Sequence, residues 1–288
     1  MSLPVSSNIS ALIKLLDEPD ERAFQLIRQQ IYSLGVEAIP ALENALENTF
    51  DPLVQERITE ISHQLQTENL YVDFVNWVKL EPSDLLKGFV LVTKIRYPNL
   101  DESEIKSKIE DIRMDIWLEL HENLTALENI KVLNHIFFEV YHFDGNKENL
   151  SAPQNSFINT LLESRQGNPL SLGILYMLLA RKLNLPVFGV NLPQHFILAY
   201  LSDMGMENPT EKEVLFYINP FNKGAVFTRR EIELFIRQMK IKPDPAFFAP
   251  CTNLDIIHRL INNLIFAYTK LGDNEKIEDL EILLNAFE

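Results

Sequence analysis

The sequence predicts an α+β fold that is predominantly helical, with a small antiparallel sheet packed on a buried central helix and helical hairpins at its flanks. Three observations support this prediction. A helix with almost no polar face begins near Pro169, runs rich in β-branched and aromatic residues follow it, and amphipathic helical stripes fill most of the remaining chain. A helix that is apolar all round has to be buried, so the rest of the chain is expected to pack around it.

Composition narrows the class of protein. With 288 residues, 46% of them hydrophobic, the chain can form a large core. A net charge of -15 and a pI near 4.9 argue against nucleic acid or an anionic membrane as a partner, because binding to those depends on clustered Lys and Arg. A single Cys excludes an internal disulfide, and neither a signal peptide nor a spanning apolar run is apparent, so a cytoplasmic location is expected.

Residues 1–68 are predicted to form a helical segment. One of its apolar stripes comprises Phe24, Ile27, Ile31 and Leu34 and stops at Gly35, which is a good residue to end a helix. The pairing of helices near a regular period resembles a HEAT-type repeat. Fewer than the three copies that a free-standing solenoid needs are present, so this segment is expected to cap or extend the main body.

Residues 69–150 are predicted to form a helical subdomain. Asp101, followed three residues later by Glu104, is typical of a helix start. Trp77 and Trp117 are expected to be core anchors. No metal site and no cofactor are expected, because spaced His residues without a carboxylate motif are weak evidence for metal.

The central helix belongs to a core predicted over residues 151–248. Asn168 is suited to cap the helix, and Pro169 fits its first position, where a missing N–H costs nothing. Ser171 carries the only hydroxyl of the first turn. Orphan amides and a partial positive charge at this end would stabilise an anion or a nucleophile.

The strand-like runs cover Val187 to Val190, His195 to Leu201, and Val214 to Ile218. If the second and third runs form a hairpin centred near residue 207, His195 lies directly opposite Asn219. These two side chains would then share one face of the sheet, within reach of one another.

After the strands, Thr228 and Glu231 form a capping-box pattern at the start of another helix. The Pro-rich passage that ends at Cys251 is predicted to be a linker outside the core. Residues 249–288 are predicted to form a helical hairpin joined at Gly272 and Asp273, similar to a single tetratricopeptide unit. One unit is too few to argue for peptide binding, so it is expected to dock on the core.

The densest motifs of the chain are GNPLSL, GVNLPQHF and NPFNKG, in the segment from Gly167 to Gly224. With their surroundings, from about Asn69 to Phe287, they are similar to the bacterial SirB-type transglutaminase-like family. The resemblance implies a transglutaminase-like or papain-like core, in which Cys, His and Asp or Asn form the catalytic triad. The family has no settled activity that the resemblance would bring to this chain.

The chain departs from an active transglutaminase at the nucleophile. Cys251 is the only Cys and lies far along the chain from the helix start, where Pro169 or Ser171 takes the place of the thiol. His195 matches the motif His, and Asn219 stands where an Asp is usual. The resemblance therefore makes Ser171, His195 and Asn219 candidates for a degenerate triad. Further cleft or binding candidates are Asn168, Gln166, Asn155, Gln194 and Asn222, of which Gln166 and Asn155 have side-chain amides suited to an oxyanion hole.

Three functions follow from these patterns. The leading hypothesis is a catalytically degenerate transglutaminase-like protein that binds a protein or peptide partner through this cleft and its helical flanks. The first alternative is an active hydrolase or acyl transferase in which Ser171 attacks, His195 takes the proton and Asn219 orients the ring. The second is a purely structural module that works through its helical repeats.

Overall fold

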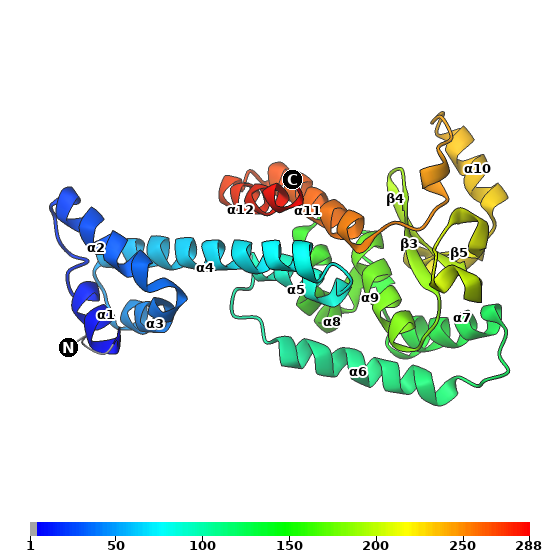
Figure 1. Cartoon of the computed structure of the whole chain (residues 1–288), viewed down its shortest axis with the longest axis horizontal. Coiled ribbons are helices and arrows are strands. Elements are labelled where there is room, and N and C mark those ends of the chain that lie inside the picture. The colour runs from blue at the N-terminus through cyan, green and yellow to red at the C-terminus, as the bar shows by residue number, and fades with distance from the viewer. Residues whose placement is uncertain (1–4) are drawn as a thin grey trace. The chain divides into compact units, whose positions relative to one another are not determined.

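The computed structural model describes residues 5–288, with side chains from residue 9 onward. It divides into two compact units, Met1–Asp73 and Phe74–Glu288. As predicted, the described chain is mostly helical and contains one small antiparallel sheet of four strands (Figure 1). The finer division into four segments stays a prediction.

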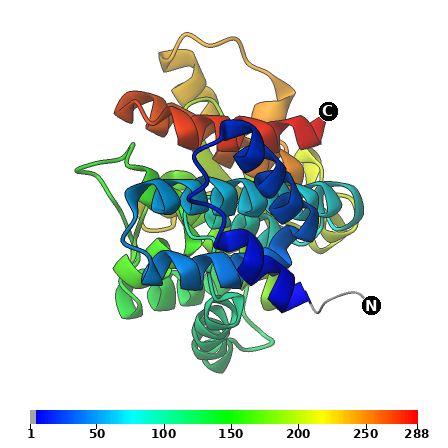
Figure 2. The ribbon, with the colours of Figure 1, turned by 90° about the vertical axis from the view of Figure 1, so that its left-hand side faces the viewer.

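The first unit is helical. Its helices are α1 (Val5–Ile13), α2 (Glu21–Leu34), α3 (Ile39–Asn48) and most of α4 (Pro52–Leu80), whose last residues belong to the second unit (blue in Figure 2). Helix α2 ends where the apolar stripe predicts, because Gly35 adopts a left-handed φ of 63°. The Arg57 guanidinium donates to the backbone oxygens of Leu16 and Glu18 and lies 3.8 Å from the centre of the Phe24 ring, which secures the loop before α2.

The second unit contains the other helices: α5 (Leu85–Lys94), α6 (Glu102–Glu119), α7 (Ala126–Asn134), α8 (Ile158–Ser164), α9 (Pro169–Lys182), α10 (Arg229–Gln238), α11 (Asn253–Leu271) and α12 (Asn274–Leu284). The predicted helix starts are confirmed. The Asp101 carboxylate accepts from the first-turn amides of α6, and Thr228 and Glu231 form a capping box at α10. Gly272, with a φ of 72°, ends α11 as predicted.

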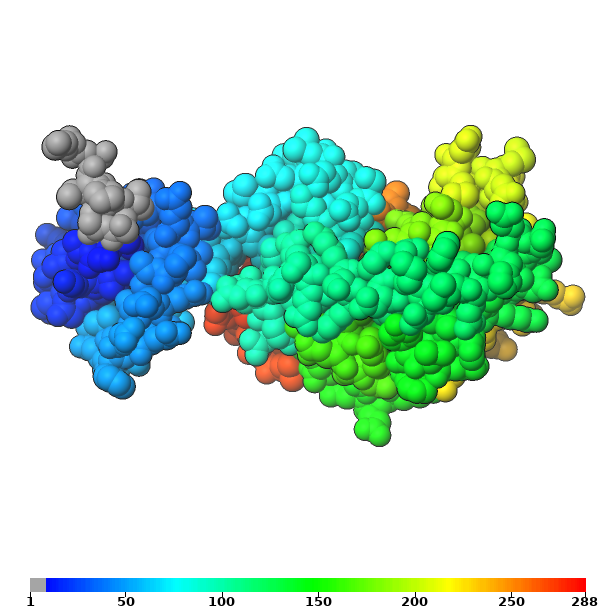
Figure 3. Space-filling model, turned by 90° about the horizontal axis from the view of Figure 1, so that it is seen from below, coloured from blue at the N-terminus to red at the C-terminus, as the bar shows by residue number. Residues whose placement is uncertain are grey.

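The two tryptophans have opposite environments. Trp77 is fully buried, as predicted, and donates its indole N–H to the Asp84 carbonyl at 2.8 Å. The prediction that Trp117 anchors the core is wrong, because its side chain is 56% exposed. Helix α6, whose surface is teal in Figure 3, buries Ile105, Ile109, Ile112 and Ile116. Trp117 follows Ile116 directly, so it lies on a different side of the helix from this stripe.

The sheet follows α9 directly. Its strands, in spatial order, are β3 (Val187–Leu192), β4 (His195–Leu201), β5 (Val214–Asn219) and β6 (Ala225–Phe227), all antiparallel to their neighbours. The first three were predicted. The short edge strand β6 and a two-residue parallel pair, β1 (Asp144–Gly145) with β2 (Gln166–Gly167), were not.

The predicted register between β4 and β5 is wrong by two residues. The structure pairs Leu198 with Ile218 and Ala199 with Tyr217, so His195 has no partner in β5. The prediction assumed a symmetric hairpin, whereas the pairing is interrupted by a bulge at Tyr200 and Leu201. A two-residue shift leaves every side chain on its expected face, because the side-chain period of a strand is two.

The two faces of the sheet pack on different helices. Ile197 and Ala199 of β4 form a buried cluster with Ile232 and Ile236 of α10. On the other face, the ring of Phe196 lies so close to α9 that a Cβ at Gly173 would come within 2.7 Å of it. Odd-numbered β4 residues therefore face α10 and even-numbered ones face α9.

Among residues 5–288, no helix is both long enough and apolar enough to span a membrane. The same residues contain no group of three or more His, Cys, Asp or Glu placed to hold a metal ion.

Candidate functional site

The start of α9 is built around Asn168, which is the helix cap that the sequence predicts. Its Oδ1 accepts from the amides of Leu170 at 3.0 Å and Ser171 at 2.9 Å. Its Nδ2 donates to Ser156 Oγ at 2.8 Å, which ties the helix start to the preceding loop. The first-turn amides expected to be available to an anion are therefore already occupied by Asn168, and only the partial charge of the helix end remains.

Ser171 is inaccessible. Its side chain is fully buried, and its hydroxyl donates to the Asn155 carbonyl at 2.6 Å and accepts from the Asn168 amide at 3.1 Å. A serine nucleophile needs a base within hydrogen-bond reach to take its proton. Here the hydroxyl donates its hydrogen bond to a backbone oxygen and not to a base. The bond attaches α9 to the loop that contains Asn155.

His195 lies on the other side of the sheet from Ser171. As an odd-numbered β4 residue it faces α10, where its ring lies 4.9 Å from that of Phe235 in an edge-to-face arrangement. Desolvation, followed by the positive charge of Arg259, lowers the pKa of His195 below its ordinary value. At neutral pH the imidazole is uncharged. The structure thus separates two members of the candidate triad by the thickness of the sheet.

Asn219 does share a face with His195, as expected. Both line a cavity of about 270 Å³ between the sheet and α10, which we call the β4 cavity. The Asn219 Oδ1 accepts from the amides of Phe221 and Asn222, so it caps the short 3-10 helix that follows β5 and does not orient the imidazole through that oxygen. The rest of this cavity is mainly apolar, apart from Glu231.

The predicted oxyanion donors have structural surroundings. The Asn155 side chain is 2% exposed, donates to the Asn149 carbonyl and accepts from the Asn146 amide. Gln166 belongs to the small parallel strand pair, opposite Asp144. Neither residue lines the β4 cavity, where the imidazole lies.

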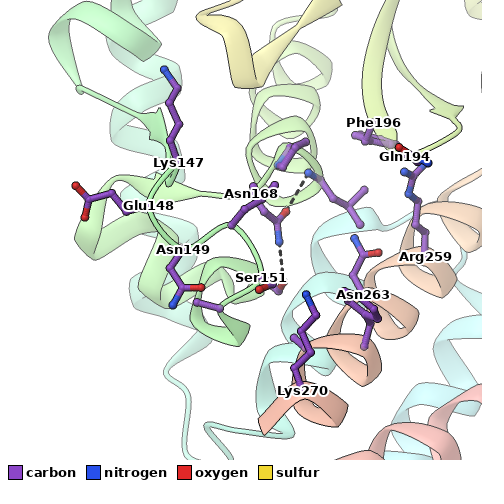
Figure 4. Close-up of a pocket in the computed structure, with 17 residues that line it drawn as sticks. Lys147, Glu148, Asn149, Ser151, Asn168, Gln194, Phe196, Arg259, Asn263 and Lys270 are labelled. Carbon is purple, nitrogen blue, oxygen red and sulfur yellow. Dashed lines mark hydrogen bonds between the residues drawn. The ribbon is translucent and has the colours of Figure 1, made fainter. Parts of the chain in front are cut away.

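A larger cavity, of about 560 Å³, opens at the head of α9, and we call it the α9 cleft. It is walled by the loop 147–152, by Asn168, Pro169 and Leu170 at the helix start, by Gln194 in the β3–β4 turn, and by one side of α11. Figure 4 shows the loop with Lys147 and Glu148 on one side of this cleft and the α11 side chains on the other. Two of the predicted binding residues, Asn168 and Gln194, line it.

The turn that presents Gln194 is tight. Leu192 and His195 pair directly across it, so only Pro193 and Gln194 connect β3 to β4. Gln194 has a φ of 61°, a conformation that L residues rarely adopt. This backbone holds the Gln194 side chain beside Arg259 at the edge of the α9 cleft (Figure 4).

Helix α11 contributes the residues that sequence reasoning missed. Arg259, Asn263, Phe266 and Lys270 follow spacings of four, three and four residues, which place them on one face of the helix along the cleft. The Arg259 Nη1 donates to Asn191 Oδ1 and to the Leu192 carbonyl, both at 3.2 Å. The polar part of this stripe was readable from the sequence, but nothing there placed it against α9.

Cys251 is not outside the core as predicted. Its amide donates to the Gly189 carbonyl of β3 at 2.8 Å, so the passage before α11 is attached to the sheet. Burial, followed by the charge of Asp255, raises the pKa of the thiol to about 12. A thiol that stays protonated at neutral pH is a poor nucleophile.

A family model and several known proteins are similar to this chain. A family model described as the transglutaminase-like superfamily matches residues 103–262. A UPF0162 protein of Xylella fastidiosa is 26% identical over 206 residues, which cover 67% of this chain and 68% of the relative. A UPF0162 protein of Pseudomonas aeruginosa is 24% identical over 195 residues, with 67% and 68% coverage.

A human relative matches over a shorter region. F-box only protein 21 of Homo sapiens is 29% identical over 156 residues, or 54% of this chain and 23% of that protein. No solved structure matches the chain. The superfamily match, residues 103–262, covers more than half of the chain and contains α9 together with the whole four-stranded sheet, and the chain therefore belongs to the transglutaminase-like superfamily.

Proposed function

We propose that this chain is a transglutaminase-like protein that carries out no acyl transfer or hydrolysis and instead binds a peptide segment of a partner protein in the α9 cleft. The cleft lies at the head of the helix where thiol enzymes with this kind of core hold their nucleophile. A cleft at this place that holds no nucleophile can bind an extended chain without acting on it.

One observation carries the proposal. The only hydroxyl in the first turn of α9, that of Ser171, is fully buried and donates to a backbone oxygen at 2.6 Å, while an open cleft of about 560 Å³ lies beside it. His195, the base of the rival enzyme hypothesis, faces α10 across the sheet. A cleft without an aligned nucleophile and base favours binding over turnover.

The size of the cleft suits a short peptide. From Arg259 to Lys270, α11 rises by roughly 16 Å, given about 1.5 Å per helical residue. An extended peptide advances about 3.3 Å per residue, so roughly five residues span this distance. Phe266, 59% exposed between the two cations, gives such a segment an apolar contact.

The test is selection from a random heptapeptide phage library on the immobilised full chain. We expect enriched peptides whose binding is lost when the cleft is filled by Asn263→Trp, since Asn263 is an exposed lining residue. The matched control is Asn262→Trp, because Asn262 is the exposed neighbour on α11 outside the cleft lining.

Two results would contradict the proposal. Either no peptide is enriched over the unselected library, or the enriched peptides bind the Asn263→Trp protein as well as the wild type. The purely structural alternative expects the first result, because a module that works through its helical repeats needs no ligand in this cleft.

A further inference from the structure

The α9 cleft carries a charge opposite to that of the chain. The protein has a net charge of -15, yet the residues that line the cleft include three cations, Lys147, Arg259 and Lys270, and one carboxylate, Glu148. Electrostatic attraction acts mainly within a Debye length, about 8 Å at physiological ionic strength, so a bound group experiences the lining more than the distant surface.

Arg259 is the strongest of these cations as a binding group. Its Nη1 donates two hydrogen bonds to neutral oxygens, the side-chain oxygen of Asn191 and the backbone oxygen of Leu192. No carboxylate within the described part of the chain forms an ion pair with it. Burial lowers the pKa of this guanidinium, because desolvation disfavours a charged group that has no counter-charge bound to it. An incoming anion would supply that charge.

The other two cations, Lys270 and Lys147, line the part of the cleft that is distant from Arg259. Lys270 Nζ lies 4.3 Å from the centre of the Phe266 ring, at the opposite end of the α11 stripe from Arg259. Lys147 belongs to the loop across the cleft from α11 (Figure 4). Neither lysine forms an ion pair with a carboxylate of residues 5–288. The start of α9, with its partial positive charge, lies between these cations in the cleft wall.

We infer that the ligand of the α9 cleft is an acidic peptide segment, with carboxylates about five residues apart and an apolar side chain between them. The inference rests on the proposed function. One carboxylate binds the guanidinium of Arg259, the second binds the ammonium of Lys270 on the side of the cleft that faces the loop of Lys147, and the apolar residue packs on Phe266. The separation follows from the rise of α11 between the two cationic ends, roughly 16 Å.

The experiment extends the phage selection. Heptapeptides that bind wild type but not Asn263→Trp are expected to be enriched in Asp and Glu relative to the unselected library. The best of them is then labelled with fluorescein, and its Kd is measured by fluorescence polarisation. We expect Arg259→Gln and Lys270→Gln each to weaken binding roughly tenfold, the size of one lost hydrogen bond to a charged group. The exposed cations Arg230 and Lys242 lie outside the cleft, and Arg230→Gln and Lys242→Gln serve as matched controls that leave Kd unchanged.

Charge is tested separately from shape. Replacing the acids of the peptide by their amides is expected to weaken binding, as is raising the ionic strength from about 0.05 M to about 0.5 M. Since the Arg259 guanidinium also binds the Leu192 carbonyl, the binding of Lys270→Gln and Lys147→Gln decides the question if Arg259→Gln fails to fold. Inorganic phosphate at millimolar concentration is expected to leave most of the peptide bound.

The outcomes separate this inference from the proposed function. If no peptide depends on the open cleft, the proposed function fails. If peptides bind the cleft but are not enriched in acids, or bind Lys270→Gln and Lys147→Gln as tightly as wild type, the inference alone is overturned. Displacement by inorganic phosphate as effective as that by the peptide itself would also overturn it, because the cleft would then recognise a small anion.

Discussion

The cap of α9 offers a direct test of how the central helix is held. In Asn168→Ala, the amides of Leu170 and Ser171 lose their acceptor, and Ser156 loses the donor that reaches it at 2.8 Å. Loss of an N-cap costs about 0.5–2 kcal/mol. A hydrogen bond between neutral side chains adds about 0.5–1.5 kcal/mol. We therefore expect the free energy of unfolding to fall by roughly 1–3.5 kcal/mol.

The tryptophans make the measurement specific. Both, Trp77 and Trp117, belong to the unit Phe74–Glu288, so intrinsic fluorescence during urea unfolding reports on the unit that contains α9. The expected result is a lower denaturation midpoint with an unchanged slope. Asn168→Ser serves as the control, because Ser caps helices about as well as Asn but is too short to replace the hydrogen bond that the Asn168 side-chain amide donates to Ser156. A midpoint for Asn168→Ala equal to that of wild type would refute the view that this residue fastens α9.

Three further changes have defined outcomes. Leu175→Ala removes a fully buried side chain of α9 and should lower the free energy of unfolding by about 2–5 kcal/mol in the same urea experiment. A denaturation midpoint equal to that of wild type would contradict the burial of this face. Burial raises the pKa of the Cys251 thiol to about 12, so the folded chain should react slowly with iodoacetamide at pH 8 and the chain unfolded in urea should react rapidly. Equal reaction rates in the two states would contradict the burial of this thiol. Because the pKa of His195 is lowered below its ordinary 6.5, the unfolded state binds its proton first as pH falls. The part of the folding stability that depends on neutral His195 should therefore be fully present above about pH 6.5 and decline below it. His195→Gln should lessen that decline. An NMR titration that gives His195 a pKa above 6.5 would contradict the expected direction of this pH dependence.

Local signals predicted most of the fold. Helix starts and ends depend on nearby residues, and Asn168, Asp101, Thr228 and Gly272 act as caps where the sequence places them. The strand runs were equally visible, because a buried strand needs β-branched and aromatic side chains. Edge strand β6 has only three residues and little burial, and such a segment has no distinct pattern.

The candidate site was harder to predict, because it depends on pairing and on distant segments. The side-chain period of two correctly predicted that His195 and Asn219 share one face of the sheet. It did not predict which helix packs on that face. The structure puts α10 there and α9 on the opposite face, which separates His195 from Ser171. Arg259 and Lys270 reach the head of α9 only through the packing of α11, a contact without a local sequence signal.

Ser171 provides a buried structural hydroxyl and is not a nucleophile. The most direct measurement is the intact mass of the purified chain after incubation with a serine-reactive fluorophosphonate. We expect no adduct on the wild type at neutral pH, since the Ser171 hydroxyl donates to the Asn155 carbonyl and forms no hydrogen bond with a basic side chain of the described residues. A stoichiometric adduct that disappears in both Ser171→Ala and His195→Gln would contradict it and establish an active serine hydrolase.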